Sequence, residues 1–183
     1  QVTNKIQVAD GLMIGALATG IPFLHKIGWD DPYIAGVHIF DVKEDPENPR
    51  FLSFWNAGEP KPCDNICLGV HRFFYNGGRY AHLSSTCDGF SNMIYRILDI
   101  QDPTHPLEAG RWWMPEQWEQ GILDKDKPSN AFPLSNPGMH GPPYVKGNHA
   151  YCGYNGAGMV ILDISNIQLP RLVGQLKTYP LLG

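Results

Sequence analysis

Short apolar runs separated by turn residues make up most of the chain. Three runs share one pattern, two apolar residues, an aspartate and another apolar residue: Ile39–Val42, Ile97–Ile100 and Ile161–Ile164. Valine, isoleucine, phenylalanine, tyrosine and tryptophan fill the runs, and glycine, proline, asparagine and aspartate separate them. β-Branched and aromatic residues favour strands, whereas the separating residues favour turns. The pattern therefore predicts an all-β protein of short strands and tight turns.

Each shared run leads into a turn that contains proline. The last proline of the turn follows the aspartate by seven residues in the second and third copies and by eight in the first. Another extended run follows each turn. An aspartate at a strand end can accept backbone N–H bonds in an Asx turn, and proline fixes φ for the bend. We therefore predict a structural role for Asp41, Asp99 and Asp163.

The copies also match upstream of these runs. His71 and His140 are each followed by glycine seven residues later and by alanine ten residues later. The same offset before Gly11 leads to Asn4, so the first copy carries asparagine where the others carry histidine. These marks lie 67 and 69 residues apart and keep their order in all three copies. Self-similarity of this kind indicates a repeat architecture.

Each copy is predicted to hold four strands, joined in turn by a glycine turn, a loop and the Asp/Pro turn. Four antiparallel strands per repeat are typical of a β-propeller blade. The apolar-Asp-apolar strand with its proline turn resembles the LVIVD-repeat proteins, and this resemblance implies a β-propeller. We expect one partial propeller domain with approximate repeat units at residues 4–70, 71–139 and 140–183.

Three blades cannot close a ring, because propellers typically have four to eight. The chain also begins with Gln1 rather than methionine, and the third unit ends early. We therefore expect a fragment of a longer polypeptide or one member of an assembly. Another chain, or the missing part of the same chain, would complete a propeller of about six or seven blades.

Composition narrows the classes of function. The net charge of −4 over 183 residues, with 17% charged residues, disfavours a nucleic-acid partner, which needs a basic face. No apolar run is long enough for a membrane-spanning helix. The sequence has no phosphate-binding loop, dinucleotide fingerprint, nucleophile elbow or zinc-protease motif. The compartment stays open, with a slight preference for a periplasmic or secreted location.

The repeat-phased histidines, His71 and His140, are the candidate chemistry. The first strand of each propeller blade lines the central channel, so both imidazoles would converge near one end of it if they lie on that strand. They would then act as acid/base groups or as ligands of a transition metal such as Zn, Cu or Fe. Asn4 departs from the pattern, so a metal would need further histidines from elsewhere. The alternatives are a metal-free polar contact with a ligand and a structural role satisfied by backbone groups.

Other residues have weaker signals. Arg72, Arg79 and Arg96 could meet an acidic ligand, but strand exposure or ion pairs between blades explain them equally well. The remaining strand histidines are predicted to be hydrogen-bonded core or surface residues: His38, His82 and His149.

The cysteines and two insertions leave alternatives open. One hypothesis pairs Cys63 or Cys67 with Cys87, and the other treats these residues and Cys152 as small buried hydrophobes. The long segment Met114–Met139 leads directly to His140, and it would be either a lid over the channel or a loop packed on a neighbour. A shorter insertion, Gly20–Tyr33, is expected to be a solvated turn.

The leading hypothesis is a propeller that binds a small molecule in its central channel, with enzymatic turnover as an option. His71 and His140 would carry that site. The rival hypothesis is a non-catalytic propeller that serves as an interaction scaffold, as many repeat proteins do. The resemblance permits both.

Overall fold

A computed structural model describes residues 2–18, 34–58, 69–119 and 137–177 of the chain. This part is almost entirely β-structure, with one short 3-10 turn, η1 (Pro115–Gln117). The strands are β1 (Val2–Ala9), β2 (Leu12–Ala18), β3 (Gly36–Asp41), β4 (Arg50–Asn56), β5 (Val70–Phe74), β6 (Tyr80–Ser85), β7 (Ile94–Asp99), β8 (Leu107–Trp112), β9 (Gly138–Met139), β10 (Tyr144–Lys146), β11 (His149–Asn155), β12 (Gly158–Asp163) and β13 (Arg171–Leu176).

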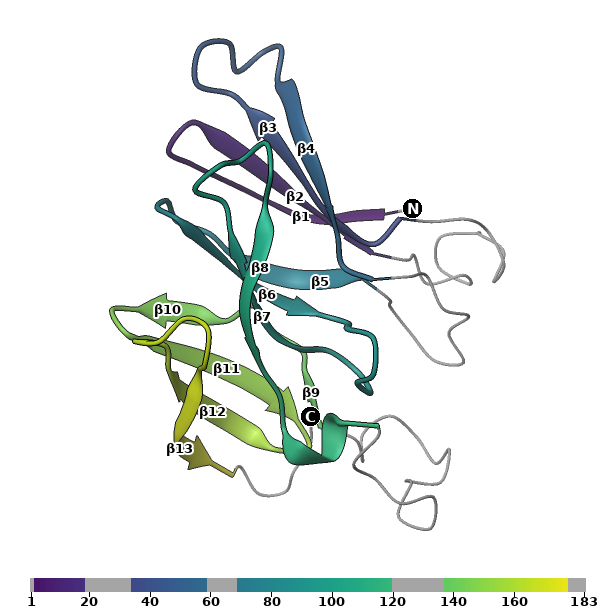
Figure 1. Cartoon of the computed structure of the whole chain (residues 1–183), viewed down its shortest axis with the longest axis vertical. Coiled ribbons are helices and arrows are strands. Elements are labelled where there is room, and N and C mark those ends of the chain that lie inside the picture. Colours follow the sequence, from purple (N-terminus) through teal and green to yellow (C-terminus); the bar gives the residue numbers. More distant parts are fainter. Residues whose placement is uncertain (1, 19–33, 59–68, 120–136, 178–183) are drawn as a thin grey trace.

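The strands form three antiparallel sheets that follow one another along the chain (Figure 1). We call them blade 1 (β1-β2-β3-β4), blade 2 (β5-β6-β7-β8) and blade 3 (β10-β11-β12-β13). In blade 3 the short strand β9 also pairs with β11, beyond the end of β10. The predicted all-β fold of four-stranded antiparallel blades is confirmed. The three sheets do not form a closed ring.

The three aspartates end equivalent strands and make equivalent turns. The carboxylates of Asp41, Asp99 and Asp163 each accept a hydrogen bond from the backbone N–H two residues further on, at 2.9–3.0 Å. Arginines pair with Asp41 and Asp99 at 2.6 Å. The N–H of Lys43 is the main cause that lowers the pKa of Asp41, and the side-chain hydrogen bonds of Arg79 do the same for Asp99. The predicted Asx turns are therefore present in all three blades.

The core lies between the blades, because strand alternation gives each sheet two faces. Between blades 1 and 2, fully buried side chains such as Ile14, Ile39 and Phe73 meet. Between blades 2 and 3, Tyr95 and Leu162 belong to a second cluster. Burial of this much apolar surface is the main stabilising contribution to the arrangement.

Polar groups also cross from blade to blade. The Gln7 side-chain amide on β1 donates to the carbonyl oxygen of Phe73 at 3.1 Å and accepts from the N–H of Tyr75. The hydroxyl of Ser53 donates to the carbonyl oxygen of Pro103 at 2.6 Å. These bonds satisfy backbone groups that the sheets leave unpaired, so they fix how one blade sits on the next.

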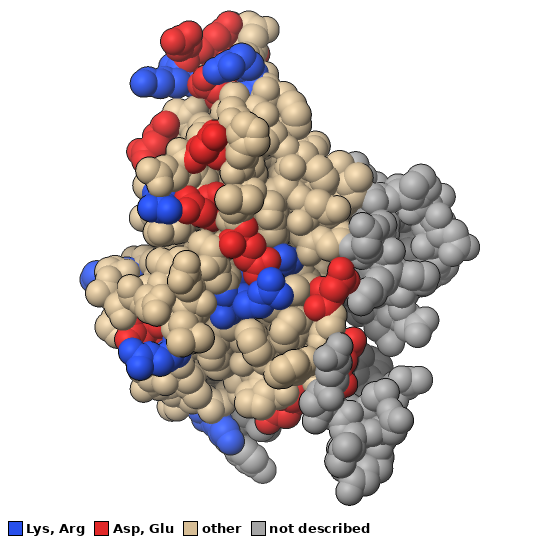
Figure 2. Space-filling view, in the orientation of Figure 1, with Lys and Arg blue, Asp and Glu red and all other residues tan. Residues whose placement is uncertain are grey.

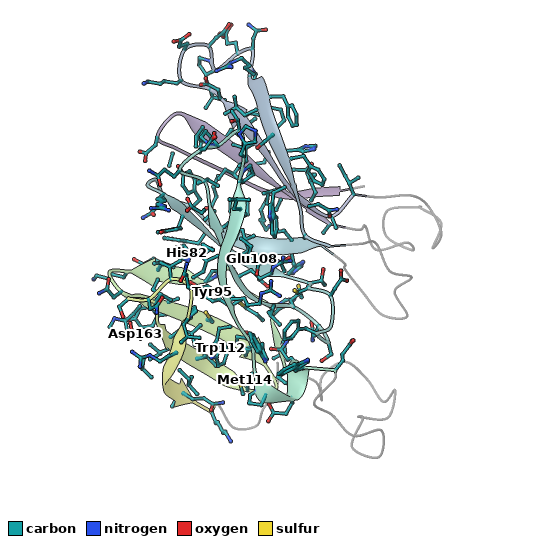
Figure 3. All side chains as sticks on the ribbon, in the orientation of Figure 1. His82, Tyr95, Glu108, Trp112, Met114 and Asp163 are labelled. Carbon is teal, nitrogen blue, oxygen red and sulfur yellow. The ribbon has the colours of Figure 1, made fainter. Side chains whose placement is uncertain are left out.

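The buried histidine of blade 2 is structural, as predicted. His82 is 6% exposed, and its Nδ1 lies 2.7 Å from the hydroxyl of Tyr95. Figure 3 shows the two side chains together near the junction of blades 2 and 3. Burial lowers the pKa of His82 to about 4, so the ring is neutral at pH 7. By contrast, His149 is exposed and His38 is half-buried among aromatic rings.

Glycine at one position of the fourth strand lets the next blade approach. A β-carbon at Gly110 on β8 would lie 1.9 Å from the carbonyl oxygen of Ile167, in the β12–β13 turn of blade 3. That oxygen belongs to backbone and cannot swing away, so the two blades would have to separate.

We therefore expect Gly110→Ala to lower the free energy of unfolding by about 1–3 kcal/mol, because it overpacks the junction. Gly153→Ala is the matched control, since nothing lies within 4 Å of a β-carbon there. Urea unfolding followed by circular dichroism measures both. Equal stability of the two variants would show that the blades do not pack in this way.

Candidate functional site

The first strands of blades 1 and 2 both contain a β-bulge at the predicted histidine position. The pairing of β1 with β2 shifts between Thr3 and Lys5, so Asn4 is the extra residue. The pairing of β5 with β6 shifts between Val70 and Arg72, so His71 is the extra residue. A bulge leaves one residue outside the ladder and turns its side chain, and bulges are frequent beside active sites.

Blade 3 interrupts its first strand at the same place. Met139 on β9 pairs with Tyr154, and pairing resumes on β10 with Tyr144 opposite Tyr151. His140 lies at the start of this interruption, and its N–H donates to the carbonyl oxygen of Gly153 at 3.1 Å. The two histidines therefore occupy equivalent positions on successive blades.

A glycine two residues before each histidine brings these strands close to the preceding blade. A β-carbon at Gly69 would lie 2.5 Å from the carbonyl oxygen of Leu17, and Gly69 has a φ of +119°. A β-carbon at Gly138 would lie 2.1 Å from the side-chain amide nitrogen of Asn92, and the following N–H, of Met139, donates to the carbonyl oxygen of Met93 at 2.9 Å. The sequence carries a signal for this arrangement in the shared Gly-x-His spacing, which the match of glycine and alanine after each histidine does not include.

The structure brings the two imidazoles together. The ring centroids of His71 and His140 lie 5.1 Å apart, with 35° between the ring planes. β5 lies against β1 and β2, so these first strands are where neighbouring blades approach each other. His140 is exposed and His71 is half-buried. The pair is thus open to solvent on one side and packed on the other.

His71 is not satisfied by backbone groups. Its Nε2 accepts a hydrogen bond from Nε of Arg72 at 3.3 Å, and its Nδ1 is buried without a partner in the described part of the chain. The pKa of His71 falls to about 4, first because of burial and then because of the positive charges of Arg72, His140 and Lys5. The imidazole is therefore neutral at pH 7, with its proton on Nδ1 while Nε2 accepts.

The described residues do not complete a metal centre. They contain no group of three or more histidine, cysteine, aspartate or glutamate side chains placed to hold a metal ion. His71 and His140 would supply two ligands, and a transition metal generally takes more.

The three arginines of blade 2 have different surroundings. Arg79 pairs with Asp99, and Arg96 is 5% exposed, bound to Glu108 at 2.5 Å and to two backbone carbonyls. Ion pairs within blade 2, rather than between blades, therefore explain both, and Arg96 also joins blade 2 to Ala57 at the end of blade 1 through a hydrogen bond. Arg72 has no carboxylate partner among the described residues.

Several predicted features lie wholly or partly outside the described residues. Of the Met114–Met139 segment, residues 120–136 are outside, and Gly20–Tyr33 lies outside entirely. The described start of the longer segment is fixed by Gln117, whose fully buried amide donates to the carbonyl oxygens of Ser91 and Met93. Cys63 and Cys67 are outside as well. Cys152 is a free, buried thiol and Cys87 a free, half-buried one.

One known repeat family matches the sequence of blade 3. A family model for the LVIVD repeat matches residues 144–178, which contain β10 to β13. The chain carries an LVIVD repeat. The resemblance seen in the sequence is thus supported, and LVIVD repeats are β-propeller repeats. No curated protein matches the chain.

The LVIVD match does not include the histidine pair. It begins after His140, and its Asp163 turn lies at the far end of β12. The match therefore covers blade 3 and its Asx turn but neither histidine. Their role has to be inferred from their own geometry.

We expect the ring signals of His71 to titrate with a pKa of about 4 in a nuclear magnetic resonance experiment. Arg72→Gln removes one of the causes that lower this pKa, so the value should rise toward 6.5 while burial keeps it below. Arg171→Gln, which removes a distant charge on blade 3, is the control. An unchanged pKa in Arg72→Gln would contradict the described contact.

Proposed function

We propose that the chain is part of a closed β-propeller that binds a small molecule at the inner edge of its blades, around His71 and His140. The observation that carries this proposal is the pairing of two repeat-equivalent imidazoles, 5.1 Å apart, at interruptions of two first strands. The strand interruptions do not serve the sheet, because each removes a ladder pair.

The unsatisfied state of His71 supports a ligand role. A buried donor without a partner costs on the order of 1–3 kcal/mol, and native structures hold few such groups. Nδ1 of His71 is one of a few among the described residues, together with Nε of Arg96 and the hydroxyl of Tyr154.

The charge state of His71 limits its chemistry. With a pKa of about 4, it is neutral at pH 7 and can accept a proton or a hydrogen bond but cannot donate a proton as a general acid. A neutral imidazole is also the form that ligates Zn, Cu or Fe. Either role, in binding or in turnover, would use His140 from the next blade.

Ring closure is the second part of the proposal, and the two outer faces of the chain support it. On blade 1, Ile6, Val8 and Phe51 are 54–61% exposed, and on blade 3, Val173 and Leu176 are 55–60% exposed. Apolar patches of this kind mark contact surfaces. We infer that further blades cover them, from another chain or from the rest of the same chain, in a ring of about six or seven blades.

Gly174 tests the closure. It occupies on β13 the position that Gly110 has on β8, yet within the described residues a β-carbon there meets only the Ile161 side chain, at 3.4 Å or more. In a closed ring, the turn of the next blade would lie against it. We expect Gly174→Ala to destabilise the native assembly by about 1–3 kcal/mol in urea unfolding. No effect would mean that no blade follows β13 in this way.

The ligand site is tested with His71→Ala and His140→Ala. Native mass spectrometry with metal analysis identifies any metal or small molecule that copurifies with the assembly. The nuclear magnetic resonance signals of the His71 and His140 rings report binding of added Zn²⁺ or of a copurified small molecule. We expect one bound species per assembly in the unmodified protein and at least a tenfold loss of its affinity in each variant. His149→Ala, an exposed histidine of blade 3 away from the pair, should retain it.

Unchanged binding in both alanine variants, with folding intact, would refute the histidine site. The rival function, a non-catalytic interaction scaffold, would be favoured if the assembly holds no bound species and the ring signals of His71 and His140 respond to no probe.

A further inference from the structure

A basic residue directly follows the bulge in two successive blades. Lys5 follows Asn4 on β1, and Arg72 follows His71 on β5. Lys5 pairs with Ala16, and Arg72 pairs with Ser84, at equivalent places of the two ladders. The third blade has Gly141 at this position. The repeat thus places two fixed positive charges beside the histidine pair.

The charges of these residues act on one another. The pKa of His71 is lowered by Arg72, His140 and Lys5 together, and no carboxylate acts on it from the described residues. Lys5 and Arg72 likewise form no ion pair there, although five other arginines do: Arg50, Arg79, Arg96, Arg111 and Arg171. The first strands of blades 1 and 2 therefore carry a local excess of positive charge around His71.

This arrangement disfavours a cation. A metal ion on the Nε2 of His71 would have to displace the guanidinium of Arg72, and the Nδ1 is buried, so metal binding would require these side chains to move. Two fixed positive charges nearby would raise the cost of binding a divalent cation further. An anion meets the opposite conditions, since its charge is attracted by the same groups.

The contact with His71 also leaves the guanidinium of Arg72 suited to an anion. Only its Nε is engaged, and the two terminal nitrogens make no bond within the described part of the chain. A guanidinium recognises carboxylate and phosphate oxygens through paired N–H donors, and an ammonium such as that of Lys5 adds a further charge-assisted bond.

We infer that the small molecule bound at the histidine pair carries a carboxylate or phosphate group, held by Arg72 and Lys5 beside His140. This inference rests on the proposed ligand site and names its ligand class. Lys5 and Arg72 are then binding residues on neighbouring blades, and His71 orients the guanidinium.

The test is a titration of the native assembly with sodium phosphate and, separately, sodium acetate, at pH 7 and constant ionic strength. The ring signals of His71 and His140 should shift saturably, while sodium chloride should leave them in place. Arg72→Gln should weaken phosphate binding about tenfold or more, and Arg72→Lys less, because an ammonium lacks the paired donors. Lys5→Gln should weaken it about threefold.

Two variants match these changes of charge elsewhere. Lys43→Gln and Arg171→Gln lie in or beside exposed turns, and both should bind phosphate as the unmodified protein does. Equal binding by Arg72→Gln and the controls would overturn the anion site. A response of the histidine signals to Zn²⁺ but to neither anion would leave the ligand site standing and refute its anionic class. A response to none of these probes would refute both.

Discussion

The packing of one sheet on the next is the constraint on which the described structure depends. Each sheet has an apolar surface on both sides, and only a neighbouring sheet removes it from water. Side chains such as Ile14 and Phe73 are buried at one junction and Tyr95 at the other, whereas Val8 and Phe51 are exposed where blade 1 has no described neighbour. The blades are therefore units of a stack rather than independent domains (Figure 1). The close approach at glycines such as Gly110 and the crossing amide of Gln7 set how they stack.

The candidate site follows from this stacking. A propeller blade approaches its neighbours most closely through its first strands, and a side chain displaced from the ladder there meets the equivalent side chain of the next blade. The bulge at His71 and the interruption at His140 displace these residues at equivalent places of successive blades. The repeat that builds the core thus also gathers polar groups at one place.

The place of a charged side chain in the stacked blades decides whether it meets a partner of opposite charge. At the tip of blade 1, where β3 turns into β4, acidic and basic side chains lie together and neutralise one another (Figure 2). Buried Arg96 is neutralised by Glu108 of the same blade, and it also donates to the backbone carbonyls of Ala57 and Thr86. Lys5 and Arg72 have no such partner among the described residues. Unpaired charge is rarely useful for stability, and here it lies beside His71 and His140, which supports the proposed ligand site.

The sequence by itself determined the four-stranded blade, its Asx turns and the equivalence of His71 and His140, because alternation, turn residues and a repeat period are local properties. It left the roles of Arg72, Arg79 and Arg96 open, since each arginine has the same local signal. Only the tertiary structure decided that Arg79 and Arg96 meet carboxylates on other strands, and that the Arg72 side chain contacts the ring of His71, its neighbour on the bulged strand β5. It likewise decided the burial of His82 against Tyr95 and the 5.1 Å approach of two imidazoles 69 residues apart in sequence. Such contacts depend on how strands pair and how one blade stacks on the next, which spacing along one chain does not specify.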